Sequence, residues 1–87
     1  MPVWHLTIKL GDLNERWRKG EIDIPELAKL VVERIKRSRW RNITPYPHTF
    51  DELIENLEKS ETKQEFNYFW GEVYDLADVD RVWIETF

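Results

Sequence analysis

The sequence contains no cysteine, so disulfide bonds and thiolate metal sites are excluded among its 87 residues. Its apolar runs are all far shorter than the roughly 18 residues that a membrane-spanning helix needs. The first five residues, Met1-Pro2-Val3-Trp4-His5, lack the basic and apolar regions of a signal peptide. We therefore expect a cytoplasmic protein with no membrane association.

Hydrophobic and aromatic residues are plentiful. The chain is 41% hydrophobic and 14% aromatic, with five tryptophans, which is enough to build a dense core in a protein of this small size. Charged residues make up another 34%, a balance typical of globular rather than disordered chains. We expect a single small domain over residues 1–87.

A strand is predicted near each end of the chain. Apolar and polar residues alternate over residues 4–10, which is the period of a half-buried strand. Residues 81–87 are rich in strand-forming types, with Val82 and Ile84 expected to face inward and Trp83 outward. Because neither strand is expected to be stable alone, we predict that the two pair antiparallel.

Three main helices are predicted between the strands, each with a polar capping residue and a glutamate three positions later. These starts are Asp23-Ile24-Pro25-Glu26, Thr49-Phe50-Asp51-Glu52 and Thr62-Lys63-Gln64-Glu65. The first helix should end near 38–40 and be followed by a loop over 41–48, and Phe69 and Val73 should be buried in the last. A short extra helix is expected near 12–19. The predicted fold class is α+β, a two-stranded antiparallel sheet on three main helices.

The C-terminal segment joins a helix end, an aspartate turn and a strand. It reads Tyr74-Asp75-Leu76-Ala77-Asp78-Val79-Asp80-Arg81-Val82-Trp83-Ile84. This segment resembles the ending of small proteins encoded by tailed phages of actinobacteria, and residues 4–10 and 35–40 are similar to that group too. The resemblance implies a phage origin and a bacterial cytoplasm. It implies no functional residues, because that group has no established activity.

No catalytic, cofactor or metal site is predicted. The two histidines are His5, expected on the outer face of a strand, and His48, in a proline-flanked loop, so neither pairs convincingly with a nucleophile. Clustered carboxylates at Asp75, Asp78 and Asp80 suit a hard cation, but the EF-hand pattern is absent. We expect a protein that is not an enzyme and has no cofactor.

A basic segment supports an alternative, nucleic-acid binding. It places five cations and Trp40 within eight residues: Arg34, Lys36, Arg37, Arg39 and Arg41. Such a segment can contact phosphates and stack on bases. However, residues 1–43 carry a net charge of +4 and residues 44–87 one of −8, so the cations are also expected to pair within the chain. Acidic helices over 50–80 that imitate a nucleic acid are a weaker alternative.

The preferred function is protein–protein interaction, because tryptophan, tyrosine and arginine dominate binding hot spots. The predicted interaction residues are Trp17, Arg37, Trp40, Tyr68 and Trp83. We predict a non-enzymatic interaction protein that binds itself, as a symmetric homodimer through the open edge of the first strand, or a host protein. Two alternatives stay open: residues 12–20 cover that edge, or Trp17 folds over Trp83.

Overall fold

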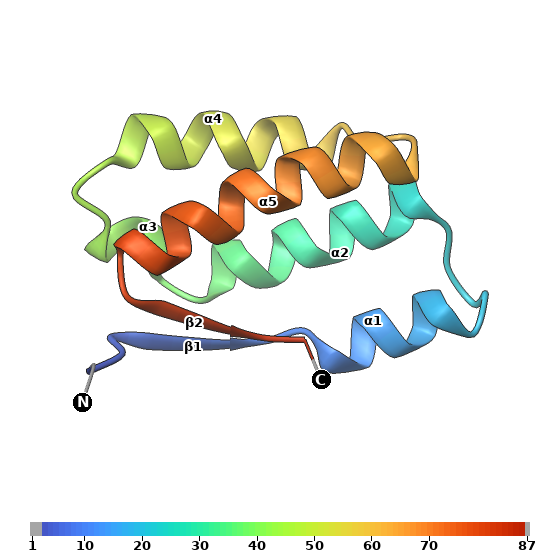
Figure 1. Ribbon diagram of the computed structural model, residues 1–87, viewed down its shortest axis with the longest axis horizontal. Helices are drawn as coiled ribbons and strands as arrows, with labels where there is room; N and C mark the ends of the chain where they lie inside the picture. Colours follow the sequence, from blue (N-terminus) through green and yellow to red (C-terminus); the bar gives the residue numbers. More distant parts are fainter. Residues whose placement is uncertain (1–2, 87) are drawn as a thin grey trace.

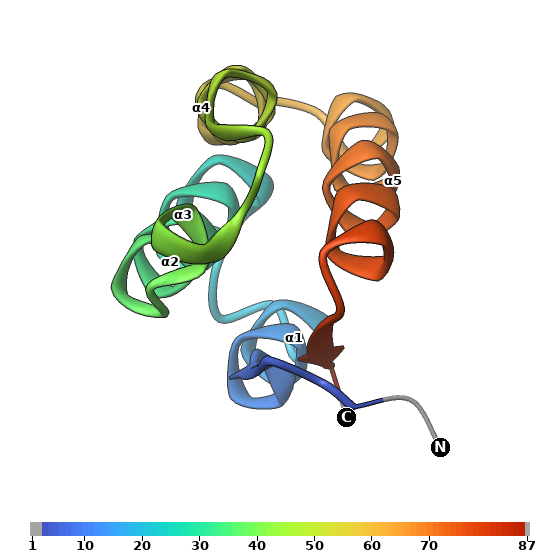
Figure 2. The same cartoon turned by 90° about the vertical axis from the view of Figure 1, so that its left-hand side faces the viewer.

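The computed structural model describes residues 3–86, which form two strands and five helices (Figure 1). In chain order they are β1 (Leu6–Lys9), α1 (Gly11–Arg18), α2 (Ile24–Arg37), α3 (Trp40–Ile43), α4 (Pro47–Glu58), α5 (Lys63–Val79) and β2 (Val82–Glu85). The long helices α2, α4 and α5 lie to one side of the strand pair (Figure 2). The α+β class and the three main helices are confirmed. No helix within residues 3–86 combines the length and apolar character that crossing a membrane requires.

The two strands pair parallel, so the predicted antiparallel pairing is wrong. Leu6 lies opposite Val82, and Lys9 lies opposite Glu85. The reason is the number of long helical passes between the strands. In Figure 1, α1 continues in the direction of β1, and α2, α4 and α5 then each reverse the chain. Three reversals return the chain to the end where β1 began, so β2 runs in the same direction as β1.

Two of the three predicted helix starts are confirmed at their capping residues. The Asp23 carboxylate accepts a hydrogen bond from the Glu26 amide at 3.0 Å, and the Thr62 hydroxyl accepts one from the Glu65 amide at 3.1 Å. The third start is wrong, because α4 begins at Pro47 and Thr49 lies inside the helix. Proline has the fixed φ that suits a first turn, and so favours this earlier start.

The segment between α2 and α4 also differs from the predicted loop. Residues 40–43 form the short helix α3 instead. The short helix expected near 12–19 is confirmed as α1, but Asp12 lies in its first turn and does not cap it. The Asp12 carboxylate instead accepts hydrogen bonds from the Arg34 guanidinium, which ties α1 to α2.

The hydrophobic core lies between the helices and the inner face of the sheet. It includes Ile8 and Ile84 from the strands, together with residues from every helix. Val73 is buried as predicted, whereas Phe69 is only partly buried. The buried face of α5 is centred on Val73, Leu76 and Ala77, and Phe69 lies at its margin.

Trp40 is completely buried, so its predicted surface position is wrong. Helix α3 carries it into the core, where its ring packs edge-on against Phe50 with centroids 5.1 Å apart. Its indole nitrogen donates a hydrogen bond of 2.7 Å to one carboxylate oxygen of Asp80. Asp80 is 7% exposed, and its other oxygen has no hydrogen-bond partner within residues 3–86. This bond ties α3 to the end of α5.

Candidate protein-interaction surface

Exposed hydrophobic side chains gather at one end of the molecule. Residues 3–86 include eight large hydrophobic side chains that are exposed. Six of them come from segments that meet where β1 and β2 begin, α5 ends and α3 leads into α4 (Figure 1). We call these six residues the apolar end: Val3, Trp4, Ile43, Tyr46, Val79 and Trp83. The other two, Tyr68 and Tyr74, lie on α5 away from that end.

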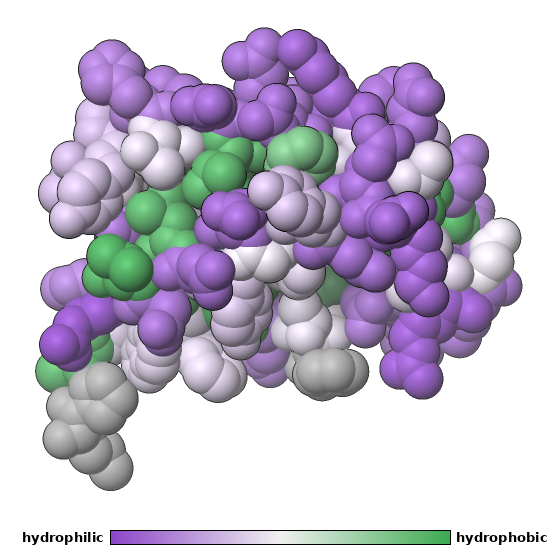
Figure 3. Space-filling model, turned by 45° about the horizontal axis from the view of Figure 1, so that its top comes forward, coloured by the Kyte–Doolittle hydropathy of each residue, from purple (hydrophilic) through white to green (hydrophobic). Residues whose placement is uncertain are grey.

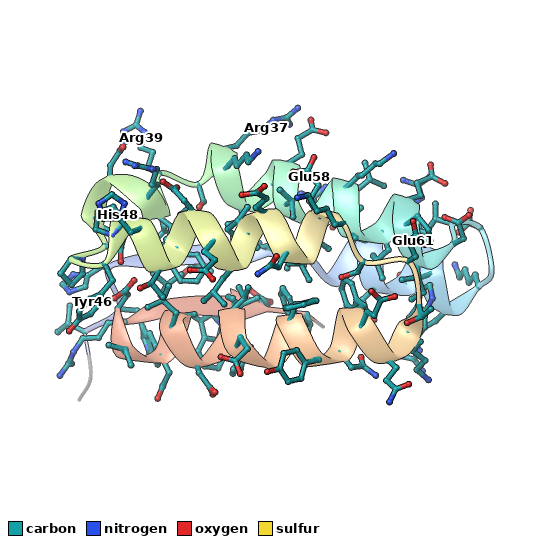
Figure 4. The ribbon with its side chains drawn as sticks, turned by 90° about the horizontal axis from the view of Figure 1, so that it is seen from above. Arg37, Arg39, Tyr46, His48, Glu58 and Glu61 are labelled. Atoms are coloured by element: carbon teal, nitrogen blue, oxygen red, sulfur yellow. The ribbon has the colours of Figure 1, made fainter. Side chains whose placement is uncertain are left out.

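The bond between Trp40 and Asp80 positions the helical part of the apolar end. Ile43 follows Trp40 by one turn of α3, and Val79 directly precedes Asp80, so this bond holds both residues at the same end. Tyr46 lies between the start of α4 and the end of α5 (Figure 4). Its amide donates a hydrogen bond of 3.1 Å to the Thr44 hydroxyl, which fixes the turn into α4. Figure 3 shows hydrophobic side chains over α4 and α5 that continue toward this end.

The sheet part of the apolar end is a pair of tryptophans. The rings of Trp4 and Trp83 meet edge-to-face with centroids 5.3 Å apart, and the residues are 39% and 43% exposed. The predicted outward position of Trp83 is confirmed. The alternative in which Trp17 covers Trp83 is wrong, because Trp17 packs at the margin of the core with the Lys63 ammonium 5.5 Å from its ring centroid.

Two arginines that follow helices adopt an unusual backbone conformation. Arg39 follows α2 with φ 71°, and Arg81 follows α5 with φ 57°. These are the non-glycine residues with positive φ within the described chain, and both occupy helix-ending positions that favour glycine. Neither has an ion-pair partner among residues 3–86, although both are exposed. Arginine costs about 1 kcal/mol more than glycine in this conformation, so both positions store backbone strain.

The rest of the basic segment is neutralised within the chain. Arg37 pairs with Glu33, and the Lys36 ammonium lies 3.7 Å from the Glu58 carboxylate. The Arg41 guanidinium donates to both oxygens of Asp51, at 2.9 and 3.0 Å.

These arginine contacts also shift carboxyl pKa values. Hydrogen bonds from Arg41 lower the pKa of the Asp51 carboxyl below its ordinary value, and the same contact raises the pKa of Arg41. The hydrogen bonds from Arg34 likewise lower the pKa of Asp12. The sequence predicted that the cations of the basic segment either pair with carboxylates of the same chain or bind nucleic acid. Of its five cations, only Arg39 lacks an ion pair within residues 3–86.

The five predicted interaction residues do not form one surface. Trp83 belongs to the apolar end, whereas Trp40 is buried and Trp17 is partly buried. Tyr68 is 65% exposed on the outer face of α5, and Arg37 is exposed on α2 with its Glu33 partner. Sequence reasoning missed the other members of the apolar end. The signals for two of these were the prolines flanking Tyr46 and the position of Val79 outside the buried stripe of α5.

The carboxylates of the C-terminal segment do not converge on a cation. Asp80 points into the core toward Trp40, whereas Asp75 and Asp78 lie exposed on α5. In the part of the chain that the structure describes, no group of three or more histidine, aspartate and glutamate side chains is arranged to hold a metal ion.

Comparisons with known proteins show similarity to a short part of one much larger protein. The chain is 30% identical over 57 residues to Chaperone protein ClpB 2 of Parasynechococcus marenigrum (strain WH8102). The matched region covers 66% of this chain but only 6% of that relative. No family model matches the chain, and no solved structure matches it.

Proposed function

We propose that this chain is a non-enzymatic, phage-encoded interaction protein that binds another protein through its apolar end. The observation that carries the proposal is that six large exposed hydrophobic residues lie on segments that meet at one end of a small fold, with the rings of Trp4 and Trp83 packed together. Large exposed apolar regions of small proteins mark interaction sites. Aromatic residues and arginine are the types enriched in such interfaces.

One charge beside the apolar end indicates the chemistry of the partner. Arg81 directly precedes β2 and has no ion-pair partner among residues 3–86, whereas Arg39 points away from this end on the side of α2 (Figure 4). A partner surface with apolar side chains next to aspartate or glutamate complements this arrangement. Binding such a partner also gives Arg81, with its positive φ, a role that glycine does not provide.

Nucleic-acid binding stays a prediction, with less support from the contacts of the basic segment. Phosphate binding requires cations that are available to replace condensed counterions. Arg34, Lys36, Arg37 and Arg41 all lie within ion-pair distance of carboxylates in the same chain. The exposed residues of the apolar end offer aromatic and aliphatic surface rather than free cations, so we favour the protein partner.

The test is capture of a partner from a lysate of actinobacterial host cells, before and after nuclease treatment. The immobilised proteins are the natural sequence, Val79→Lys within the apolar end, and Asn67→Lys as a matched control. Asn67 is exposed on the same helix, 12 residues earlier, which is about 18 Å along the axis. We expect a nuclease-resistant partner on the natural sequence and on Asn67→Lys, and its loss on Val79→Lys. Equal recovery on all three proteins, or loss after nuclease treatment, contradicts the proposal.

A further inference from the structure

The outer face of the two-stranded sheet is left uncovered by residues 3–86. Ile8, Val82 and Ile84 point into the core, whereas Thr7, Lys9 and Trp83 are exposed on the opposite side. Figure 2 shows α2, α4 and α5 on one side of the strands only. Parallel sheets occur almost exclusively with both faces covered, and a two-stranded sheet alone is marginally stable. A parallel pair with an open face and two exposed tryptophans is therefore the part of the molecule where a covering partner would add the most.

We propose that a second copy of this chain covers the open face, in a dimer with two-fold symmetry. The inference rests on the proposed function, because it assigns the sheet part of the apolar end (Val3, Trp4 and Trp83) to self-association. The helical part, Ile43, Tyr46 and Val79, is left for a different protein.

Charge favours a second copy over another partner on this face. Lys9 and Glu85 lie opposite each other in the sheet register, so one cation and one carboxylate stand side by side at the end of the strands. A surface with one charge of each sign is complementary to itself. A two-fold axis can set Lys9 of each copy against Glu85 of the other. The Trp4–Trp83 pair of one copy then packs against the same pair of the other copy and forms an aromatic layer between the two sheets.

The face is a better site for this contact than the strand edge. The Arg34 guanidinium reaches from α2 to donate a hydrogen bond of 3.0 Å to the Lys9 carbonyl, and it also binds Asp12. A charged side chain bound at a strand edge opposes pairing with another strand. Helix α1 packs against α2, and the outer sheet face stays open beside it. Sheets that pack face to face lie about 10 Å apart, which leaves room for interleaved indole rings.

Light scattering coupled to size exclusion tests the dimer. For the natural sequence, the mass should rise from 10.7 kDa toward twice that value as the concentration increases to ~300 μM, well above micromolar affinities. Trp83→Lys should stay at the monomer mass, and Asn67→Lys should behave like the natural sequence. Far-UV circular dichroism verifies that each variant is folded, which is expected because both positions are exposed. A monomer mass for the natural sequence at the highest concentration overturns the inference, as does a dimer that Trp83→Lys leaves intact.

Charge exchange tests the arrangement within the dimer. Lys9→Glu should weaken dimerisation about tenfold, because it sets two carboxylates of the two copies against each other. Lys9→Glu combined with Glu85→Lys should restore it. A double variant no better than the single one overturns the face-to-face arrangement.

The two proposals fail separately. A monomeric protein whose partner capture still depends on Val79 refutes only the dimer. A dimer without Val79-dependent capture refutes only the proposed function.

Discussion

Trp40→Phe is expected to destabilise the protein far more than the loss of a few ring atoms suggests. The indole of Trp40 is fully buried and donates the hydrogen bond that satisfies one oxygen of Asp80. Phenylalanine fills most of the same space but has no donor. The carboxylate would then have no hydrogen-bond partner for either oxygen among residues 3–86, because its second oxygen already lacks one.

The expected cost follows from two terms. Leaving the buried acceptor of Asp80 without its donor costs about 2 kcal/mol, and more where the acceptor is charged. The smaller ring adds about 1 kcal/mol for lost contacts and a residual void. A domain of this size has a free energy of unfolding of about 4–13 kcal/mol, so a loss of about 3 kcal/mol is a large fraction of it.

A double-mutant cycle with Asp80→Asn measures how much of this hydrogen bond depends on the charge of the Asp80 carboxylate. The asparagine oxygen can still accept from the indole, but the charge is gone, so Trp40→Phe should cost about 1–2 kcal/mol less in that background. Urea unfolding followed by circular dichroism avoids the change in tryptophan fluorescence that the substitution itself causes. A cost below about 1 kcal/mol, or the same cost in both backgrounds, refutes the reasoning that this bond holds α3 against α5.

Three further changes are expected to have smaller effects. Arg34 lowers the pKa of Asp12, so this pair stabilises the fold above the ordinary pKa of the carboxyl, 3.8, and the contribution is lost as the pH falls through that region. Thermal melts between pH 3 and pH 6 should therefore show a shallower acid loss for Asp12→Asn, with a difference below about 1 kcal/mol because the pair is exposed. Thr62→Ala removes the cap of α5 and should lower the free energy of unfolding by about 1 kcal/mol, whereas Gln64→Ala at an exposed position of the same turn should change it little. Arg39→Gly should raise stability by about 0.5 kcal/mol through relief of positive φ, and a decrease in urea-melt stability would count against the strain.

Local sequence signals predicted local structure well. The caps at Asp23 and Thr62 involve residues three positions apart, and both are formed as expected. The burial of Val73 and the outward position of Trp83 likewise depend on periodicity within one element. The parallel direction of the strands could also have been predicted. Three helices that each reverse the chain return it to the end where the first strand began, so the last strand runs the same way.

Features that depend on distant residues could not be predicted in the same way. Trp40 is buried in a core built from distant elements, where its indole N–H donates a hydrogen bond to Asp80, 40 positions away. The apolar end could not be predicted, because its segments lie far apart in the sequence. They come together only in the folded chain, where Trp40 of α3 is hydrogen-bonded to Asp80 at the end of α5. In isolation, Trp4 looked like an inward strand residue and Tyr46 like part of a loop.

The measurement that tests the central claim most directly is the affinity of the purified partner for matched variants of this protein. Isothermal titration calorimetry with the natural sequence, Val79→Lys and Asn67→Lys compares the apolar end with a distant site on the same helix. If the apolar end is the binding surface, Val79→Lys should weaken the affinity by about 30-fold or more, the effect of losing a hot spot of about 2 kcal/mol. Asn67→Lys should stay within about threefold of the natural sequence. Equal affinities for Val79→Lys and the natural sequence would contradict the account.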